Sequence, residues 1–403
     1  MARRNLAVVS SLSLLTSACP LDRTHPFIPA PQSSPAPQTC LHSDLPLSQP
    51  RPGYTPWTHP PTCTTINPKG DKLCVFTDAT YHSGRGLSIV ARPQVVGKLL
   101  DDGVFPGRKD IPDVSQEAKY EARIQPGMGT GLFVKDGHSF EAGEVILTDY
   151  PTLILPAEGF EGADADVLQS LAWKGLLQLP KEGRDVTRGL ARSKAELGVD
   201  EIVDLVDTNA FTHEDGGGVH NVLFPLASRM NHACVPNAIT RTNETTLSLE
   251  VIALKTIPSG AQIFNSYLDP SQLSSSAERA HSLQSMWSFP CRCDICAGAG
   301  VSRSDARRRE LAQARAQLEN SKGNAVELLK GAETILKLMA EEGMVIPRGQ
   351  YLELAAMATK YLGKIGEARE WARKAKKHWD IILGEHSEES KEMVEFEKEL
   401  GGQ

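Results

Sequence analysis

The residues best suited to chemistry are three cysteines, Cys291, Cys293 and Cys296, which have the spacing C-x-C-x-x-C. Zinc takes four donors in a tetrahedron, and closely spaced cysteines can supply three of them from one loop. Disulfides or free thiols are the alternative, but a C-x-C pair makes a strained disulfide, and C-x-x-C is common in metal loops. The spacing therefore predicts a zinc site whose fourth donor comes from elsewhere in the chain.

A second concentration of chemistry is the stretch of residues 228–237, which holds two amides, an imidazole and the thiol of Cys234 within ten positions. A core strand or helix does not normally carry so many hydrogen-bonding groups. Cys234 is also the only other cysteine outside the N-terminal arm. A lone histidine is more often a core residue than a site residue. His232 differs because it lies between Asn231 and a candidate metal ligand.

Two further segments have polar or glycine-rich character. Gly129 and Gly131 allow the backbone to approach a bound molecule closely, although a hairpin turn explains a glycine pair equally well. Residues 263–267 end in Tyr267, for which an aromatic residue at the edge of a β-sheet core is the alternative interpretation. An earlier glycine pair, Gly84 and Gly86, is explained by a tight turn between two short strands.

Taken in order, the glycine-rich turn, residues 228–237, the segment ending in Tyr267 and the cysteine loop resemble the SET-domain protein-lysine methyltransferases. The order of the motifs is far more specific than any one of them, and the resemblance covers about residues 120–296. It is strongest to the branch with a post-SET zinc loop and a helical C-terminal domain. The MYND finger inserted in that branch is missing, because no cysteine lies between Cys74 and Cys234. Gln262 stands where an acidic residue is frequent.

The resemblance implies an S-adenosylmethionine site and a zinc site. Its cofactor-binding positions correspond to Met128, Gly129, Thr130, Gly131, Asn209, Ser228, Asn231, His232, Tyr267 and Phe289. Its zinc ligands correspond to Cys234, Cys291, Cys293 and Cys296. With four sulfur ligands the zinc is structural, since no position remains open for water. It would tie the C-terminal part of the loop to the region of Asn231.

Tyr267 matches the catalytic position of the family, where the methyl group of the cofactor meets the target amine. Lysine has a pKa of ~10.4 in water, whereas the attacking amine must be neutral. A narrow apolar channel lowers that pKa by desolvation. Phenolic and backbone oxygens then orient the amine, and most of the rate comes from alignment and electrostatics.

The elements that must position these residues follow from periodicity. Short strands are expected at residues 74–76, 87–90, 132–134, 145–147, 153–155 and 247–254. Amphipathic helices are expected around 167–177 and over 195–207, and apolar stripes at helical spacing continue from residue 302 onward. The C-terminal helices resemble tetratricopeptide-type repeats without a clean period, and a plain helical bundle is the alternative.

The N-terminus carries the three parts of a secretory signal peptide: Arg3 and Arg4, an apolar run over residues 6–15, and a small-residue site at 16–18. A disordered N-terminus and a transit peptide are the alternatives. Half of the 26 prolines precede residue 70, which indicates a disordered or extended arm. Cys19, Cys40, Cys63 and Cys74 are compatible with disulfides in an oxidising compartment, and Cys63–Cys74 would close a short loop.

The expected domains are a signal peptide (1–18), a Pro-rich arm (19–70), an N-terminal extension (71–119), a SET domain (120–270) with a helical insert (156–208), a post-SET zinc loop (271–299) and a C-terminal helical domain (300–403). The 403 residues suffice for two or three domains. A net charge of −7 argues against coating nucleic acid. No apolar run reaches the ~20 residues that a membrane span needs.

The sequence therefore predicts an α+β protein that methylates a lysine of a protein substrate, histone or non-histone, with S-adenosylmethionine and Zn²⁺. A monomer is favoured, without direct nucleic-acid binding. The localisation depends on the signal peptide: the secretory pathway if it is used, otherwise the nucleus or cytoplasm. One alternative is a non-catalytic SET-fold protein that binds partners through its helical domain. Another is a secreted interaction protein with all eight cysteines in disulfides.

Overall fold

The computed structural model describes residues 55–67, 69–101, 118–157, 165–215, 218–243, 246–320 and 323–401. These residues belong to one unit, which spans residues 49–403. The expected signal peptide and most of the expected Pro-rich arm lie outside the described residues. The last part of that arm does not match the expectation of disorder, because a strand forms at Thr62–Thr65.

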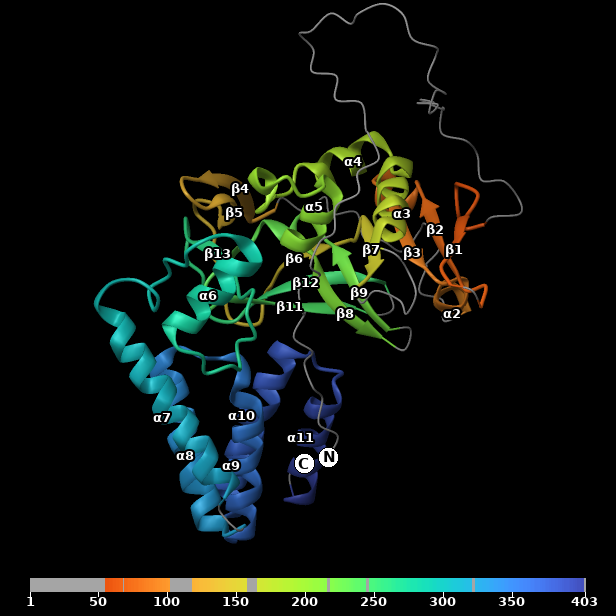
Figure 1. Cartoon of the computed structure of the whole chain (residues 1–403). Coiled ribbons are helices and arrows are strands. Elements are labelled where there is room, and N and C mark those ends of the chain that lie inside the picture. The colour runs from red at the N-terminus through yellow and green to blue at the C-terminus, as the bar shows by residue number, and fades with distance from the viewer. Residues whose placement is uncertain are drawn as a thin grey trace, which may run out of the picture. The chain divides into compact units, whose positions relative to one another are not determined.

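Helices and strands alternate along the first part of the chain, and helices alone follow (Figure 1). The strands are β1 (Thr62–Thr65), β2 (Lys72–Asp78), β3 (Leu87–Ala91), β4 (Tyr120–Gln125), β5 (Gly129–Val134), β6 (Val145–Asp149), β7 (Leu153–Pro156), β8 (Phe211–Asp215), β9 (Gly218–Leu223), β10 (Asn231–His232), β11 (Ala238–Asn243), β12 (Ser248–Ala253) and β13 (Gln262–Asn265). The helices are α1 (Tyr81–Gly84), α2 (Pro93–Asp101), α3 (Ala165–Gln178), α4 (Lys181–Arg188), α5 (Glu201–Asn209), α6 (Ser276–Trp287), α7 (Val301–Glu319), α8 (Ala325–Glu342), α9 (Gly349–Tyr361), α10 (Ile365–Ile382) and α11 (Glu388–Glu399). The predicted α+β class is confirmed.

The strands of the described residues form three sheets. Their orders are β1-β2-β3-β7-β9-β8, β10-β13-β5-β4 and β11-β12-β6. The first sheet joins the N-terminal extension to the expected SET domain, because β3 pairs in parallel with β7. All five residues of β3 are buried, with Ile89 in one hydrophobic core and Val90 in another. Cores on both faces explain why this strand is apolar at every position except Ser88 and does not alternate.

The turn between β2 and β3 contains the glycine pair that the sequence explained as structural. Gly84 and Gly86 both have φ +87°, a conformation that glycine adopts without strain. Cys63 and Cys74, directly opposite each other in β1 and β2, form a disulfide, as the short loop suggested. The expected tight turn is thus present.

The helical insert covers one face of the first sheet. Leu171 and Leu176 of α3 and Leu205 of α5 share a core with Val75 and Val90. The helix predicted over residues 195–207 is confirmed only from residue 201 onward, in α5. A 3₁₀ turn, Ala195–Leu197, ends at Gly198 (φ +71°), and α5 begins only after Asp200, whose side chain accepts a hydrogen bond from the Ile202 N–H. A left-handed glycine and a new N-cap interrupt the periodicity.

The segment predicted as a zinc loop, residues 271–299, contains the helix α6. Its start is a capping box in which the Ser275 hydroxyl accepts from the Glu278 N–H and the Glu278 carboxylate accepts from the Ser275 N–H. The pattern Ser-x-x-Glu was visible in the sequence and could have indicated this helix.

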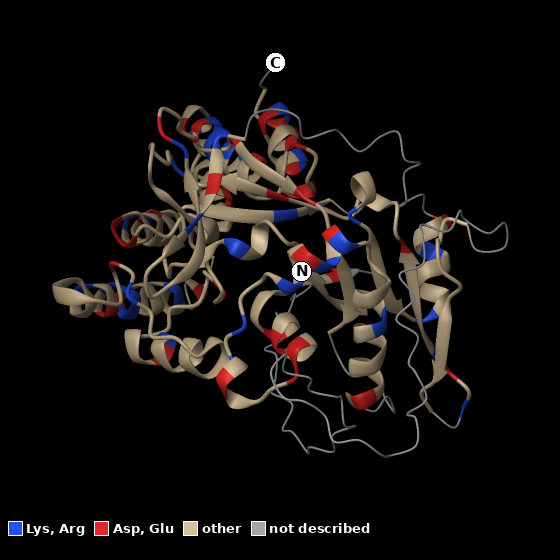
Figure 2. Ribbon diagram, turned by 90° about the horizontal axis from the view of Figure 1, so that it is seen from above, with Lys and Arg blue, Asp and Glu red and all other residues tan. Residues whose placement is uncertain are grey.

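The C-terminal helices α7 to α11 pack as successive neighbours, and α7 to α10 run side by side in Figure 1. Ala332, Ile335 and Met339 of α8, which recur at helical spacing in the region where apolar stripes were predicted, are buried in their core. Helix α7 also holds the chain that follows Tyr267, because Arg308 donates to the carbonyl oxygen of Gln272 at 3.1 Å. Acidic and basic residues are interspersed over the described chain, as Figure 2 shows.

None of the described helices combines the length and the apolar character that crossing a membrane would need.

Candidate active site and metal centre

The central strand of the second sheet brings three motifs together. Strand β13, directly before Tyr267, pairs in parallel with β10 and antiparallel with β5. Asn231 therefore lies opposite Phe264, and Ile263 lies opposite Leu132. The glycine-rich turn, the Asn231-His232 stretch and the tyrosine segment, which are more than 100 residues apart at their extremes, occupy three adjacent strands.

The glycine at position 131 is required by its neighbours. A Cβ atom there would lie 2.2 Å from Gln262 Nε2 and 2.9 Å from Asn231 Nδ2. Both amide nitrogens are buried and have no hydrogen-bond partner among the described residues. Unsatisfied buried donors cost free energy and are rare in native proteins, so each calls for an explanation. Two such donors at one glycine make a cradle for a ligand that accepts hydrogen bonds.

The rest of the glycine-rich turn lies at the connecting turn of the β4–β5 hairpin, where Gln125 pairs with Gly129. Gly129 has φ +73°, so a side chain at this position would be strained. Met128 is 43% exposed, and Thr130 is partly buried. Unlike Gly131, Gly129 has open space around its backbone, since a Cβ atom added there would meet nothing within 4 Å among the described residues.

His232 connects the predicted cofactor residues to the predicted metal ligands. The Tyr267 N–H donates to His232 Nδ1 at 2.9 Å, so the proton of the neutral ring is on Nε2. That nitrogen lies 3.2 Å from Cys234 Sγ and donates to it. Burial lowers the pKa of His232 to about 4, which keeps the ring neutral. Both ring nitrogens therefore already have partners within the protein.

Tyr267 lies in an aromatic environment, and its hydroxyl group has one fixed partner. The hydroxyl donates to the carbonyl oxygen of Met230 at 2.8 Å. Burial raises the pKa of Tyr267, so the phenol stays protonated. Because the proton is directed at Met230, the lone pairs of the phenolic oxygen remain as acceptors.

Two aromatic residues of the α6 region complete this environment. The rings of Trp287 and Phe289 lie 5.2 and 6.2 Å from that of Tyr267, and Phe289 also lies 6.2 Å from His232. Trp287 was not among the predicted site residues. Its indole N–H donates to the carbonyl oxygen of Thr208, which joins α6 to the end of α5.

Asn209 and Ser228 lie next to each other, but their polar groups are largely occupied. Asn209 Nδ2 donates to the carbonyl oxygens of Ala191 and Leu205 at 2.7 and 2.8 Å. The Ser228 hydroxyl donates to the carbonyl oxygen of Asn209. These bonds fix the chain before the Asn231 stretch, and the Asn209 amide nitrogen has no proton left for a ligand.

The four predicted metal ligands form one cluster. The sulfur atoms of Cys234, Cys291, Cys293 and Cys296 all lie within 4.8 Å of one another, and all four residues are free cysteines. Cys234 Sγ is 3.4 Å from Cys296 Sγ and 3.9 Å from Cys291 Sγ. A tetrahedron with Zn–S bonds of about 2.3 Å has sulfur–sulfur edges of about 3.8 Å. This geometry can hold a metal ion, and it contradicts the alternative with all eight cysteines in disulfides.

A buried cation that the sequence did not reveal lies against this cluster. Arg279 of α6 is 3% exposed, and its Nη2 donates to Cys296 Sγ at 3.4 Å. Hydrogen bonds from neighbouring sulfurs, Cys234 first, and from Arg279 lower the pKa of Cys296. Positive charge beside clustered sulfurs favours their thiolate forms, which are the forms that bind metal.

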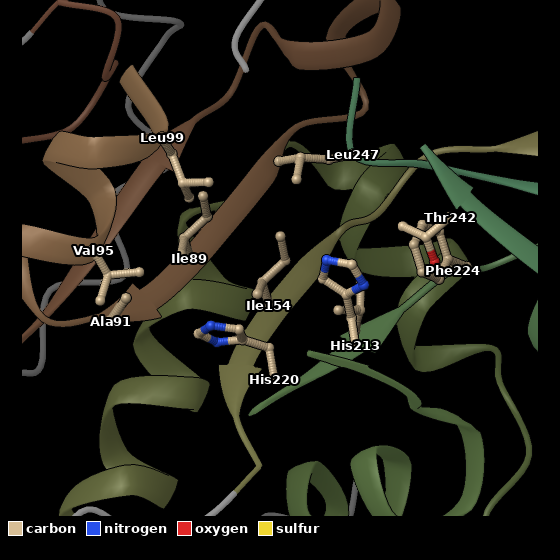
Figure 3. Close-up of a pocket in the computed structure, with 11 residues that line it drawn as sticks. Ile89, Ala91, Val95, Leu99, Ile154, His213, His220, Phe224, Thr242 and Leu247 are labelled. Carbon is tan, nitrogen blue, oxygen red and sulfur yellow. The ribbon is translucent and has the colours of Figure 1, made fainter. Parts of the chain in front are cut away.

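A separate apolar cavity lies between the first sheet and the β11–β12 hairpin (Figure 3). Its lining includes Ile154, Phe224 and Leu247, together with His213 and His220 from opposite positions of β8 and β9. No predicted site residue lines it.

Comparisons with known proteins agree with this arrangement. A family model of the SET domain matches residues 129–268. N-lysine methyltransferase SMYD2 of Gallus gallus is 28% identical over 165 residues, which cover 40% of this chain and 36% of that protein. Protein-lysine N-trimethyltransferase SMYD5 of Homo sapiens is 35% identical over 108 residues, 26% of this chain and 25% of the relative.

Histone-lysine N-methyltransferase set5 of Schizosaccharomyces pombe is 33% identical over 26% of this chain and 32% of its own length. Among solved structures, the SET domain of LSMT bound to lysine and AdoHcy covers 76% of this chain and 91% of that chain, at 13% identity. The TM-score is 0.28, so the two chains superpose only loosely.

Residues 129–268 match the SET-domain family, and the predicted resemblance to SMYD-like SET-domain protein-lysine methyltransferases is confirmed. The chain spans only about a quarter to a third of the length of the curated relatives that it matches.

Proposed function

We propose that this protein transfers methyl groups from S-adenosylmethionine to a lysine side chain of a protein substrate. The observation that carries the proposal is the pairing of β13 with both β5 and β10. It joins the glycine-rich turn, Asn231-His232 and Tyr267 in one place. The names of the relatives, which describe protein-lysine methylation, support the same activity.

The polar groups around Gly131 fit the proposed cofactor. S-adenosylmethionine carries carboxylate, ribose and adenine acceptors and supplies an electrophilic methyl group on its sulfonium sulfur. Asn231 and Gln262 each have an amide donor without a partner in the described structure, and each can donate to such an acceptor. Gly129 keeps the backbone open and Gly131 leaves room for the two amides, while Met128, Thr130 and Phe289 would contact the remaining surface. His232 holds Cys234 and the backbone of Tyr267 in place through the hydrogen bonds of its two ring nitrogens.

Tyr267 has the chemical properties that the target amine needs. Its hydroxyl proton is donated to Met230, so the phenolic oxygen can accept a hydrogen bond from the amine and point its lone pair forward. The aromatic rings of Trp287 and Phe289 exclude water and disfavour an ammonium group by desolvation. The contribution of the chain is alignment and desolvation rather than covalent catalysis.

We also propose that the four-cysteine cluster holds a structural Zn²⁺. Four soft sulfur donors at tetrahedral spacing match zinc better than any hard cation. The ion would join the loop after α6 to Cys234, two residues beyond His232. Zinc binding would therefore stabilise the Asn231-His232 part of the proposed cofactor site without taking part in the reaction.

The test is incubation of the purified full chain with methyl-labelled cofactor and a panel of lysine-bearing proteins, followed by mass spectrometry. The matched variant is Tyr267→Phe, which keeps the ring and removes the hydroxyl group. Cofactor affinity should change little, whereas the single-turnover rate should fall about tenfold for each ~1.4 kcal/mol of lost alignment. The missing hydroxyl could instead leave space for a further methyl group, so the product is identified as well.

If Tyr267→Phe matches the parent in rate and product, Tyr267 is a packing residue and the catalytic assignment is wrong. If the parent binds the cofactor and modifies no protein in the panel, the chain is a SET-fold binding protein rather than an enzyme.

A further inference from the structure

The turn between β2 and β3, residues 79–86, has a strained conformation that the proposed function does not use. His82 and Ser83 have φ +45° and +58°, values that residues with a side chain rarely adopt, and Gly84 and Gly86 follow at +87°. Such backbone outliers persist where the surrounding structure holds them, and they cluster at functional sites. Besides the buried Tyr81, this turn directs Arg85 into the protein, and the Arg85 side chain is only 12% exposed.

The turn is tightly packed at Arg85 and Gly86. A Cβ atom on Gly183 of α4 would lie 1.9 Å from the Arg85 carbonyl oxygen. A Cβ atom on Gly86 would lie 2.6 Å from Pro180 Cδ. The helical insert therefore packs directly on this turn, while the ring of His82 stacks on Tyr150 at 4.2 Å.

The guanidinium group of Arg85 reaches Asp149, the last residue of β6. Arg85 Nη2 lies 3.4 Å from Asp149 Oδ1 and also donates to the Tyr150 carbonyl oxygen at 3.2 Å. The Asp149 side chain is fully buried. Burial raises the pKa of Asp149, and Arg85 together with backbone N–H donors opposes that rise. A carboxylate without water needs such partners to remain charged.

The second oxygen of Asp149 holds the chain that leads into the site. Asp149 Oδ2 accepts hydrogen bonds from the backbone N–H groups of Leu226 and Ala227 at 2.6 and 2.9 Å. These residues begin a 3₁₀ turn, Ala227–Arg229, in which the Met230 N–H donates to the Ala227 carbonyl oxygen. The carboxylate acts as an N-cap supplied by a distant strand.

The same turn ends at the partner of the proposed catalytic hydroxyl. The Met230 carbonyl oxygen accepts the hydrogen bond of Tyr267, and Asn231 with its free amide donor follows directly. A continuous series of contacts thus runs from Arg85 through Asp149 and the turn to Tyr267. Arg85 belongs to the N-terminal extension, which lies outside the matched SET domain at residues 129–268.

We propose that Arg85 and Asp149 are positioning residues: their buried ion pair fixes the turn at residues 226–230 and thereby the orientation of the Tyr267 hydroxyl. The N-terminal extension thus contributes to the proposed active site through Arg85 without contacting Tyr267 directly. Its effect on methyl transfer rests on the proposed function, whereas its effect on the turn does not.

The experiment compares full-length Arg85→Met with the parent in two measurements. The first is hydrogen–deuterium exchange at the amides of residues 226–230, which reports on the turn without any activity. The second is the single-turnover methyl-transfer rate beside cofactor affinity. Arg85→Met should speed exchange of the Leu226 and Ala227 amides at least about tenfold, because their acceptor loses its counter-ion. The rate should fall about 10- to 100-fold, the effect expected of a misplacement of about 1 Å.

Two further variants separate positioning from general stability. Arg85→Lys keeps the charge and should restore part of both the protection and the rate. Arg85→Met combined with Asp149→Asn should protect the turn better than Arg85→Met alone, because an amide oxygen accepts hydrogen bonds without needing a cation. This pair also covers the case in which Arg85→Met does not fold. The control is Arg307→Met, which removes a half-buried arginine paired with Glu342 and should alter neither readout.

Unchanged exchange and rate in folded Arg85→Met would overturn the inference and leave the proposed function intact. Arg307→Met with equally fast exchange at residues 226–230 would also overturn it, since the effect would then be general. If the parent transfers no methyl group but Arg85→Met still loses protection of the turn, the positioning role stands and the proposed function falls.

Discussion

Replacing Gly131 by alanine tests the cradle in the proposed cofactor site. The added Cβ would lie 2.2 Å from Gln262 Nε2, whereas ordinary contact begins at 3.4 Å, so the Gln262 amide must move by more than 1 Å. The Asn231 amide nitrogen, 2.9 Å from the added Cβ, must also move. Both donors would leave the positions from which they reach a ligand.

The expected loss of affinity follows from those two donors. A net hydrogen bond is worth about 1–1.5 kcal/mol, so two misplaced donors cost about 2–3 kcal/mol. That corresponds to a roughly 30- to 150-fold rise in the Kd for S-adenosylmethionine. Overpacking should also lower the free energy of unfolding by about 1–3 kcal/mol. Calorimetric titration and urea unfolding measure the two effects separately.

The controls distinguish displacement of the two amide donors from a general loss of stability. Gly137→Ala makes the same chemical change at φ +78° with nothing among the described residues within 4 Å. It should cost about 1–2 kcal/mol of stability and leave the Kd unchanged. Combining Gly131→Ala with Gln262→Ala removes the nearest collision, so stability should recover while affinity does not. An unchanged Kd in folded Gly131→Ala would refute the placement of the cofactor at these amides.

Two further predictions concern the metal centre and the C-terminal helices. Elemental analysis should find one zinc per chain. Cys293→Ser should lose the metal and unfold at a lower temperature, by about 2–4 °C for each kcal/mol of lost stability, whereas Cys63→Ser should retain the metal. A zinc-free parent protein of full stability would contradict this prediction. Glu342→Met leaves Arg307 and Arg308 without their buried carboxylate. It should therefore cost about 3–5 kcal/mol in urea unfolding with zinc content unchanged, and a loss below about 1 kcal/mol would show that the pair is not buried as described.

Local sequence patterns predicted those parts of the fold that depend on neighbouring residues. Alternation and β-branched runs predicted β3, β5 and β12, and apolar stripes predicted α8 to α10, because burial of one face follows the period of the element. The glycine pair at Gly84 and Gly86 was correctly interpreted as a turn. The helix predicted over residues 195–207 began too early, because periodicity alone does not detect the left-handed glycine at position 198.

The candidate site was predictable as a set of residues but not as an arrangement. The order of the motifs indicated a SET domain and named Asn231, Tyr267 and the four cysteines. Their roles as ligands and as a catalytic group stay predictions. The tertiary structure shows which polar groups have partners: the Asn209 amide is occupied, whereas the Asn231 and Gln262 amides are free within the described chain.

Long-range contacts were decided by the tertiary structure alone. Arg85 and Asp149 are 64 residues apart in sequence, and nothing in either local segment marks them as partners. They meet because β3 pairs with β7, which brings the β2–β3 turn to the end of β6. Arg279 reaches the cysteines because α6 forms where a loop was expected. The periodicity of apolar residues indicates which face of a helix or strand is buried. The pairing and packing of distant elements determine which residues lie against that face.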